Sequence, residues 1–417
     1  MSLRTTPTDN TMRLAYLDRT DCLVTYVEGT ITSTGITGVS STTIFTCTGN
    51  SSVIYDDDSG AIALACNENG TDYHIVWLQT DPTYDALHQV MYSKSLDGGG
   101  TWDSPTEIAI TPVDNDSFHS VRIMGDSDGR LFILFQYEDD SEWGNAGYQQ
   151  VWLYRSTDDG DTWSKIQTWT YAYEFCDIQI DSSDNVYVLY EEFQSPWRVV
   201  CRKSTDNGDA FGSEVTVSSF STTDFKAELD ESDNLHVIYA DYYRSGNAEN
   251  PHHVVSTDGG SSFSASHAVE TDLNGLWQFP GAVPGFAIDG NDIHFVWGVR
   301  VYEDIGYSHS DDSGSTWSEY VDTGFSHNVD YGDELEVYQQ GPQRTIYDGS
   351  TILYVFGTKY SGALDYLGCM TSGDGGSLWT QSSILAYGKN NHYTPTLATY
   401  FITEEAVSNA VVYFFLA

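Results

Sequence analysis

The chain has 417 residues, and its 17 Lys and Arg against 61 Asp and Glu give a formal net charge of −44 at pH 7. This balance excludes a protein whose main partner is the phosphate backbone of DNA or RNA, and it argues against docking on anionic lipid. A hydrophobic share of 40% excludes wholesale disorder, because there is ample apolar surface to bury. The length would suit two or three average domains, although large β architectures also run this long as one unit.

The acidity is biased toward Asp, with 42 Asp and 19 Glu against only 6 Lys. A hydrated, self-repelling surface of this kind is typical of saline surroundings, where salt screens the charges. Asp is also a preferred residue of tight turns, so a hairpin-rich fold would produce the same bias. The composition alone leaves both interpretations open.

The N-terminal residues MSLRTTPTDNTMRLAYLDRTD lack the apolar core of a signal peptide, and no apolar run approaches the ~20 residues of a membrane helix. The six cysteines are too few and too scattered for a disulfide scaffold, and no CxxC pair indicates a zinc site. We expect most of them to be small core residues. A disulfide between Cys47 and Cys66 stays open, and neither a metal nor a cofactor is predicted.

One octet recurs six times, with the pattern Ser-x-Asp-x-Gly-x-(Thr/Ser)-(Trp/Phe) in its clearest copies. Its chemistry is that of a hairpin turn: the Asp carboxylate accepts backbone N–H groups, the Gly permits positive φ, and the final aromatic ring packs on the sheet. The spacing lacks the terminal Glu of a calcium loop. A structural role is therefore predicted for the octet aspartates, which are Asp97, Asp158, Asp206, Asp258, Asp312 and Asp374.

A turn followed by a hydrophobic strand precedes each octet, as in DSDGRLFILFQY from Asp126 and DESDNLHVIY from Asp230. These runs are rich in Val, Ile and aromatic residues, and nothing in the chain shows a sustained helical period. Each unit is therefore predicted to form four strands, with the octet between the third and the fourth. Histidines recur at one second-strand position and so belong to the repeat: His74, His236 and His294.

The octet resembles the Asp box, or bacterial neuraminidase repeat, and the chain is similar to Asp-box β-propellers of the sialidase-like superfamily. The resemblance implies an all-β fold: a single β-propeller of four-stranded antiparallel blades over residues 1–417. Seven blades are expected, with six as the alternative. Residues 1–30 and 388–417 would together form the closing blade, so that N- and C-terminal strands pair and remove the exposed sheet edges.

Sialidases would imply an arginine triad, a Tyr–Glu nucleophile pair, an acid/base Asp and an Arg-Ile-Pro motif. This sequence contains no Arg-Ile-Pro, so no catalytic residue is carried over. The resemblance instead implies where a ligand binds: on the face opposite the octets, around the central funnel. Ligand-binding candidates on the inner strands and on the loops of that face are His119, Arg122, Glu174, Asp177, Lys226, Tyr242, Arg244, Trp277, His392 and Tyr393.

Each candidate also has a structural interpretation. Arg122 would suit a carboxylate or sulfate, or would pair with a neighbouring Asp. His119 and Arg122 with Tyr242 match, in residue type only, the groups that abstract a proton from an acidic sugar in propeller polysaccharide lyases. The adjacent His252 and His253 should point apart on a strand.

Two acidic pairs complete the candidates, Glu191–Glu192 and Asp139–Asp140, and we expect them at solvated loop tips.

Three hypotheses follow. The favoured one is a non-catalytic recognition or adhesion propeller that binds a glycan or surface receptor on a virion or cell surface. Other virion or surface proteins are further candidate partners. The alternatives are an extracellular glycan-active enzyme, a hydrolase or lyase, and a purely structural assembly component. Whether the chain is an enzyme stays open, and neither nucleic-acid binding nor membrane insertion is expected. An extracellular or virion-surface location, in a virus from saline water, is the expected setting.

Overall fold

The computed structural model describes residues 11–18, 22–32, 35–48, 61–66, 71–83, 87–112, 116–139, 149–192, 197–218, 222–241, 251–269, 285–299, 304–319, 321–326, 343–347, 353–361, 364–372, 377–378, 380–388, 396–400 and 413–416. Within these residues every regular element is a β-strand. No helix there is long and apolar enough to cross a membrane.

Five separate sheets each contain four strands that pair antiparallel in chain order. The first comprises β4 (Ile62–Cys66), β5 (Tyr73–Thr80), β6 (His88–Ser95) and β7 (Thr106–Ile110). The second comprises β8 (Ser117–Gly125), β9 (Leu131–Glu138), β10 (Gln149–Ser156) and β11 (Ser164–Thr170). The third comprises β12 (Ala172–Ile180), β13 (Val186–Glu192), β14 (Arg198–Ser204) and β15 (Val215–Thr216).

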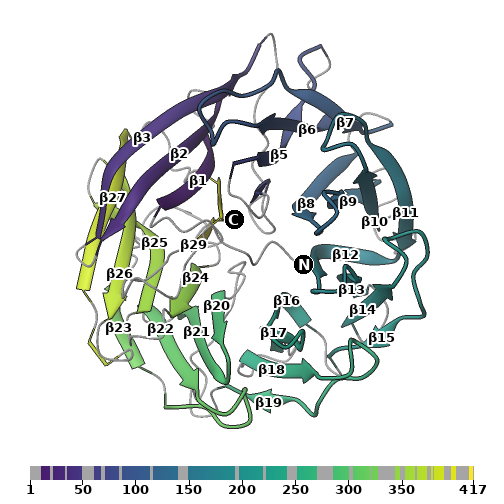
Figure 1. The fold of residues 1–417 in the computed structure, drawn as a ribbon. Helices are drawn as coiled ribbons and strands as arrows, with labels where there is room; N and C mark the ends of the chain where they lie inside the picture. The colour runs from purple at the N-terminus through teal and green to yellow at the C-terminus, as the bar shows by residue number, and fades with distance from the viewer. Residues whose placement is uncertain are drawn as a thin grey trace.

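The fourth sheet comprises β16 (Thr222–Leu229), β17 (Leu235–Asp241), β18 (Pro251–Ser256) and β19 (His267–Ala268). The fifth comprises β20 (Gly285–Asp289), β21 (Asp292–Val299), β22 (Asp304–Ser310) and β23 (Val321–Ser326). Figure 1 shows the sheets arranged around a common centre, with β8, β12, β16 and β20 nearest to it. The chain is therefore a β-propeller, which confirms the expected all-β class with antiparallel four-stranded sheets.

The remaining strands form one nine-stranded sheet in the order β27-β26-β25-β24-β29-β28-β1-β2-β3. They are β1 (Thr11–Asp18), β2 (Leu23–Thr32), β3 (Gly35–Thr46), β24 (Gln343–Tyr347), β25 (Leu353–Ser361), β26 (Leu364–Ser372), β27 (Thr380–Gly388), β28 (Thr396–Tyr400) and β29 (Tyr413–Leu416). Strand β1 pairs with β28, so the two ends of the chain share a sheet.

The apolar core lies between adjacent sheets. One cluster joins Ile75 of β5 to Phe118 of β8 and Phe135 of β9, and another joins Leu134 of β9 to Ile178 of β12. The second strands β5, β9 and β13 are buried on both faces, which explains why their sequences are nearly continuous hydrophobic runs. Neighbouring sheets therefore hold each other in place.

The octets form the turns that their chemistry predicts. In the second sheet, Ser156 Oγ donates to Asp158 Oδ1 (2.7 Å) and accepts the Gly160 N–H (2.8 Å). The Asp158 carboxylate also accepts the Thr162 N–H (2.8 Å) and hydroxyl (2.5 Å), and these hydrogen bonds lower the pKa of Asp158 to about 2. The turns around Asp97, Asp206, Asp258 and Asp312 repeat this pattern, and Asp374 lies outside the described residues.

Each described octet packs its glycine on a side chain of the preceding sheet, and Gly160 allows a direct test. Its φ is 82°, and an added Cβ would lie 2.0 Å from Tyr92 Oη. Gly129 has a similar φ of 80° but nothing within 4 Å of the same position. We expect Gly160→Ala to lower the free energy of unfolding by about 1–3 kcal/mol more than Gly129→Ala, because only the first overpacks a core.

Urea denaturation of both glycine variants measures this difference directly, since the backbone strain is common to both. Equal losses would show that the close approach of Tyr92 to the turn contributes nothing to stability.

Two octets are directly preceded by a basic residue whose side chain bonds the next octet along the chain. Lys94 Nζ donates to the Asp159 backbone carbonyl and the Asp161 carboxylate (both 2.8 Å). Arg155 donates to the Asp209 carboxylate (2.7 Å) in the same way. Several of the few basic residues are thus used to join neighbouring sheets.

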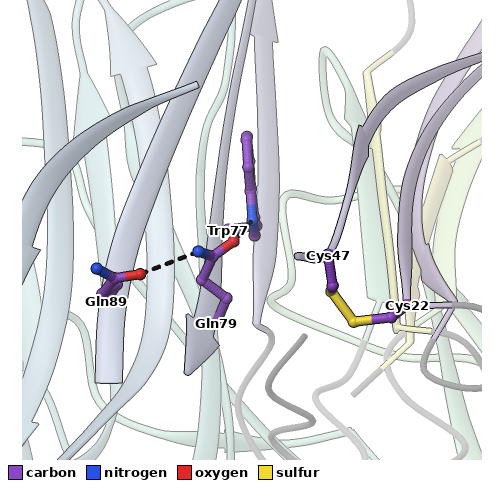
Figure 2. The surroundings of a disulfide bond; sticks show 5 residues. All are labelled: Cys22, Cys47, Trp77, Gln79 and Gln89. Atoms are coloured by element: carbon purple, nitrogen blue, oxygen red, sulfur yellow. Dashed lines mark hydrogen bonds between the residues drawn. A yellow bond between two sulfur atoms is a disulfide. The ribbon is translucent and has the colours of Figure 1, made fainter. Parts of the chain in front are cut away.

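The disulfide links Cys22 to Cys47, at a sequence separation of 25 residues, and joins the ends of β2 and β3. The pairing of Cys47 with Cys66 that the sequence left open is wrong, because Cys47 is bonded to Cys22 and Cys66 is fully buried in β4 outside any disulfide. Cys176 and Cys201 are likewise buried and outside any disulfide, as expected of small core residues. Figure 2 shows the bridge near Trp77, whose Nε1 donates to Gln79 (3.0 Å).

We expect the variant Cys22→Ser/Cys47→Ser to lose about 2–4 kcal/mol in the free energy of unfolding, because the closed loop restricts the unfolded chain. Urea denaturation with and without a thiol reductant measures this. The reductant should lower the midpoint of the native chain and leave that of the double variant unchanged. An unchanged midpoint for the native chain would contradict the prediction.

Candidate functional site

The two ends of the strands define two faces of the propeller. The octets and the turns between first and second strands leave from one end, which we call the octet face. Because neighbouring strands are antiparallel, β8 begins and β9 ends at the other end, which we call the opposite face.

On the octet face, the turns between first and second strands are joined to one another. The Ser127 N–H and hydroxyl donate to the Asp184 carboxylate of the next turn (2.9 and 2.6 Å), and the Ser182 N–H donates to Asp233 of the turn after that (3.0 Å). These bonds tie the octet-face ends of β8, β12 and β16 together.

Three of the predicted residues occupy matched positions on successive inner strands. Arg122, Asp177 and Lys226 pair with Leu134, Leu189 and Ile238 respectively. Each partner is the fourth residue of its second strand, so the three charged residues lie at the same level. Strands β8 and β16 both contact β12, and Figure 1 shows the three strands around the centre.

We call Arg122, Asp177 and Lys226 the inner-strand charge row. Lys226 Nζ lies 3.3 Å from Asp177 Oδ2, and Arg122 Nε lies 3.9 Å from Asp177 Oδ1. The side chains of all three are buried, with 5–10% of their surface exposed.

The Asp177 carboxylate also accepts the backbone N–H groups of Ile178 (3.0 Å) and Ala227 (3.1 Å). These backbone donors come from β12 and from the neighbouring β16. They fix the carboxylate at a place where two cations from different sheets meet it.

His119 lies closer to the opposite face, near the start of β8. Its Nε2 is 2.8 Å from Ser117 Oγ and 3.5 Å from Glu138 Oε2, and the His119 and Glu138 side chains are each 27% exposed. Glu138 also accepts the Gln149 side-chain amide (3.0 Å). A partly exposed imidazole beside a carboxylate is an arrangement suited to moving a proton.

The structure does not describe the side chains of the other candidates. Tyr242, Arg244, Trp277, His392 and Tyr393 lie outside the described residues, and the side chain of Glu174 on β12 does too. Of the ten candidates, the structure therefore brings together Arg122, Asp177 and Lys226, and it places His119 on the same strand as Arg122.

The expectation for Glu191 and Glu192 is wrong. They do not form a solvated loop tip but end β13, with 1% and 7% of their surface exposed. Glu192 accepts the Arg198 Nε–H (2.7 Å), which compensates its burial. Asp139 is partly buried, and Asp140 lies outside the described residues.

The histidine predictions are confirmed. His253 is buried against His236, with 3.0 Å between His253 Nε2 and His236 Nδ1, whereas His252 turns to the other side and bonds Ser266 (2.9 Å). His74 bonds Tyr92 and His294 bonds Tyr307 at the corresponding positions (2.7 and 2.9 Å). Each of these hydrogen bonds lies within one four-stranded sheet.

Sequence reasoning missed Glu138 and Ser117, the neighbours of His119. Glu138 precedes Asp139 and Asp140 in an acidic stretch, and nothing in that run distinguishes the one carboxylate that ends a strand. The pairing of Ser117 with Glu138 across β8 and β9 is what places both beside the imidazole. Only the strand register shows this.

No protein-family model matches the chain, and no curated protein matches it. Among solved structures, the chain is similar to an ulvan lyase of polysaccharide lyase family PL25, with 12% identity over 81% of this chain and 85% of the other, at a TM-score of 0.55. It is also similar to a PL25 ulvan lyase bound to -[GlcA(1-4)Rha3S]-, with 13% identity, the same coverage and a TM-score of 0.54.

A Hadza microbial sialidase, Hz136, aligns with 14% identity over 87% of this chain and 74% of its own, at a TM-score of 0.45. At such identities, the likeness to the ulvan lyases shows a shared fold.

Proposed function

We propose that this chain is a glycan-active enzyme that cleaves an acidic polysaccharide on its inner strands, entered from the opposite face. The observation that carries the proposal is the inner-strand charge row, with His119 on the same strand as Arg122. Arg and Lys are well suited to hold a carboxylate or sulfate group, and His119 beside Glu138 is suited to transfer a proton.

The chemistry that these residues fit best is β-elimination from a uronic acid. Arg122 and Lys226 would stabilise the negative charge that grows on the sugar carboxylate when the C5 proton leaves. His119 would accept that proton. The electron pair then forms a C4=C5 double bond, the C4–O bond breaks, and the departing oxygen takes up a proton.

The fold supports this proposal over the non-catalytic recognition propeller favoured from the sequence. The ulvan lyase with which the chain shares its fold acts on a polysaccharide, and one such structure holds a glucuronate-containing, sulfated ligand. Fold alone never fixes an activity, so the charged residues are the main support for the proposed function and the shared fold is secondary.

We also propose the finer architecture. Seven blades, closed by the pairing of β1 with β28, would form a single sialidase-like domain whose octets are Asp boxes. The Cys22–Cys47 bridge supports an extracellular or virion-surface location, because disulfides persist in oxidising surroundings. The acidic composition would suit a saline setting, and other surface proteins would be secondary partners.

The test is to incubate the full chain with ulvan, with another uronate-containing polysaccharide and with neutral arabinan. We expect the ultraviolet absorbance of an unsaturated uronate to rise with the acidic polymers only, and Arg122→Met to abolish the rise. New reducing ends without that absorbance would show that the chain hydrolyses the glycosidic bond instead of cleaving it by elimination. Binding without any product would restore the recognition hypothesis and overturn the proposed enzyme.

A further inference from the structure

Strand β8 contains one more residue than the part of β9 that it pairs with. His119 pairs with Gln136, and Arg122 pairs with Leu134, so three steps along β8 match two steps along β9. The extra residue lies within Ser120–Val121. Such a β-bulge changes which face of the sheet the following side chains occupy.

The consequence for the site follows from strand alternation. Gln136 and Leu134 are two residues apart and share a face of the sheet, so their partners His119 and Arg122 share it too. Without the extra residue, residues 119 and 122 would point to opposite faces. Arg122 would then lie on the side of Phe118.

The packing agrees with this assignment. Phe118, Val121 and Ile123 belong to the apolar cluster shared with β5, on one side of the sheet. On the other side, Arg122 meets Asp177 of β12, and Leu134 belongs to the cluster shared with β12 and β13. The bulge therefore keeps a guanidinium out of an apolar core and turns it toward the charge row.

Ser120 is the residue that makes the bulge. Its φ is 50°, in the left-handed region that residues other than Gly rarely adopt, and it is fully buried. Its side chain and carbonyl both bond the neighbouring inner strand: the Cys176 N–H donates to Ser120 Oγ (3.3 Å), and Cys176 Sγ donates to the Ser120 carbonyl (3.1 Å). Cys176 directly precedes Asp177.

We infer that Ser120 is a positioning residue for the site, in which its left-handed backbone and its two bonds to Cys176 hold His119 and Arg122 on one face beside Asp177. The inference rests on the proposed function for its catalytic meaning. The structural part of the inference does not depend on that function. Whatever the ligand, Ser120 determines which face of the sheet the following β8 side chains occupy, and it bonds β8 to β12.

The test compares Ser120→Val with Ser120→Gly in the full chain, with ulvan as the substrate. Valine resists the left-handed region, so we expect kcat to fall on the order of 100-fold while KM changes about threefold or less. Glycine keeps the conformation and loses only the side-chain bond, so it should retain at least about a tenth of kcat.

Ser93→Val is the matched control: Ser93 is equally buried and its hydroxyl donates to the Asp103 carbonyl (2.8 Å), far from the bulge in sequence. It should leave kcat unchanged.

A second readout separates this inference from the proposed activity. In NMR spectra of histidine-labelled protein, assigned with His119→Gln, the His119 imidazole signals should shift in Ser120→Val and stay close to the native signals in Ser120→Gly. If no glycan is cleaved, the proposed enzyme fails while this comparison still tests Ser120. Native His119 signals in folded Ser120→Val, or equal losses in Ser120→Val and Ser93→Val, would overturn the positioning role.

Discussion

Replacing Asp177 with Ala is expected to lower the free energy of unfolding by about 3–5 kcal/mol, which is large for one side chain. The substitution removes the carboxylate that Lys226 and Arg122 share at 3.3 and 3.9 Å. It also removes the acceptor of two backbone N–H groups. Two like charges would then remain close together, with 6% of the Lys226 side chain and 10% of the Arg122 side chain exposed.

Urea denaturation of three variants measures the effect. Asp161→Ala removes a carboxylate that is 70% exposed from its ion pair with Lys94, and Asp159 still accepts the Lys94 ammonium. It should cost about 1 kcal/mol or less, because solvent screens the exposed partner. The triple variant Asp177→Ala/Arg122→Met/Lys226→Met should recover much of the loss, since replacing a whole buried charged group with apolar side chains is often nearly neutral. Equal costs for Asp177→Ala and Asp161→Ala would contradict the prediction.

Acidification from pH 7 to pH 4.5 is expected to destabilise the fold by several kcal/mol. Burial lowers the pKa of His74 and His252 to about 4 and that of His253 and His294 to about 3, from 6.5 in the unfolded chain. Below pH 6.5 these histidines therefore bind protons in the unfolded state but stay neutral in the folded state. The free energy of unfolding that these neutral histidines contribute is fully present above pH 6.5. It falls as the pH drops toward the folded pKa values, by up to about 1.4 kcal/mol per pH unit for each histidine.

His253→Tyr tests the source of this pH dependence. His253 occupies the position that Tyr92 and Tyr307 fill in other sheets, each hydrogen-bonded to a histidine of the second strand. The tyrosine variant should show a pH dependence shallower by about 1.4 kcal/mol per unit between pH 6 and 4.5, with similar stability at pH 8. Free energies of unfolding across this range provide the measurement. An unchanged slope would assign the acid sensitivity to other groups.

Repeated features were predictable because their chemistry is local. The octets around Asp97, Asp158, Asp206, Asp258 and Asp312 contain their own donors and acceptors, so the sequence pattern and the hydrogen bonds coincide. The equivalence of His74, His236 and His294 followed from the same repetition. Arg122, Asp177 and Lys226 were each recognised as charges on inner strands, but their shared level depends on strand register.

What the sequence could not supply is non-local. Cys22 and Cys47 meet because β2 and β3 form a hairpin in a stretch that departs from the repeat, and no spacing rule indicates that. The bulge at Ser120 is invisible, since a serine in a strand normally alternates like its neighbours. Glu191 and Glu192 resemble surface acids until Arg198 is placed beside them.

The pairing of β1 with β28 has a consequence for how the chain is made. Residues 13–17 pair on one side with residues 396–400, which a ribosome synthesises long after β1. Throughout synthesis the inner edge of β1 therefore presents unpaired backbone groups, a hazard for association between nascent chains. The sheets from β4 to β23 pair only with local strands and can fold as they emerge. We expect chains that stall before residue 396 to aggregate through β1, and a permuted gene that joins the two ends to relieve this.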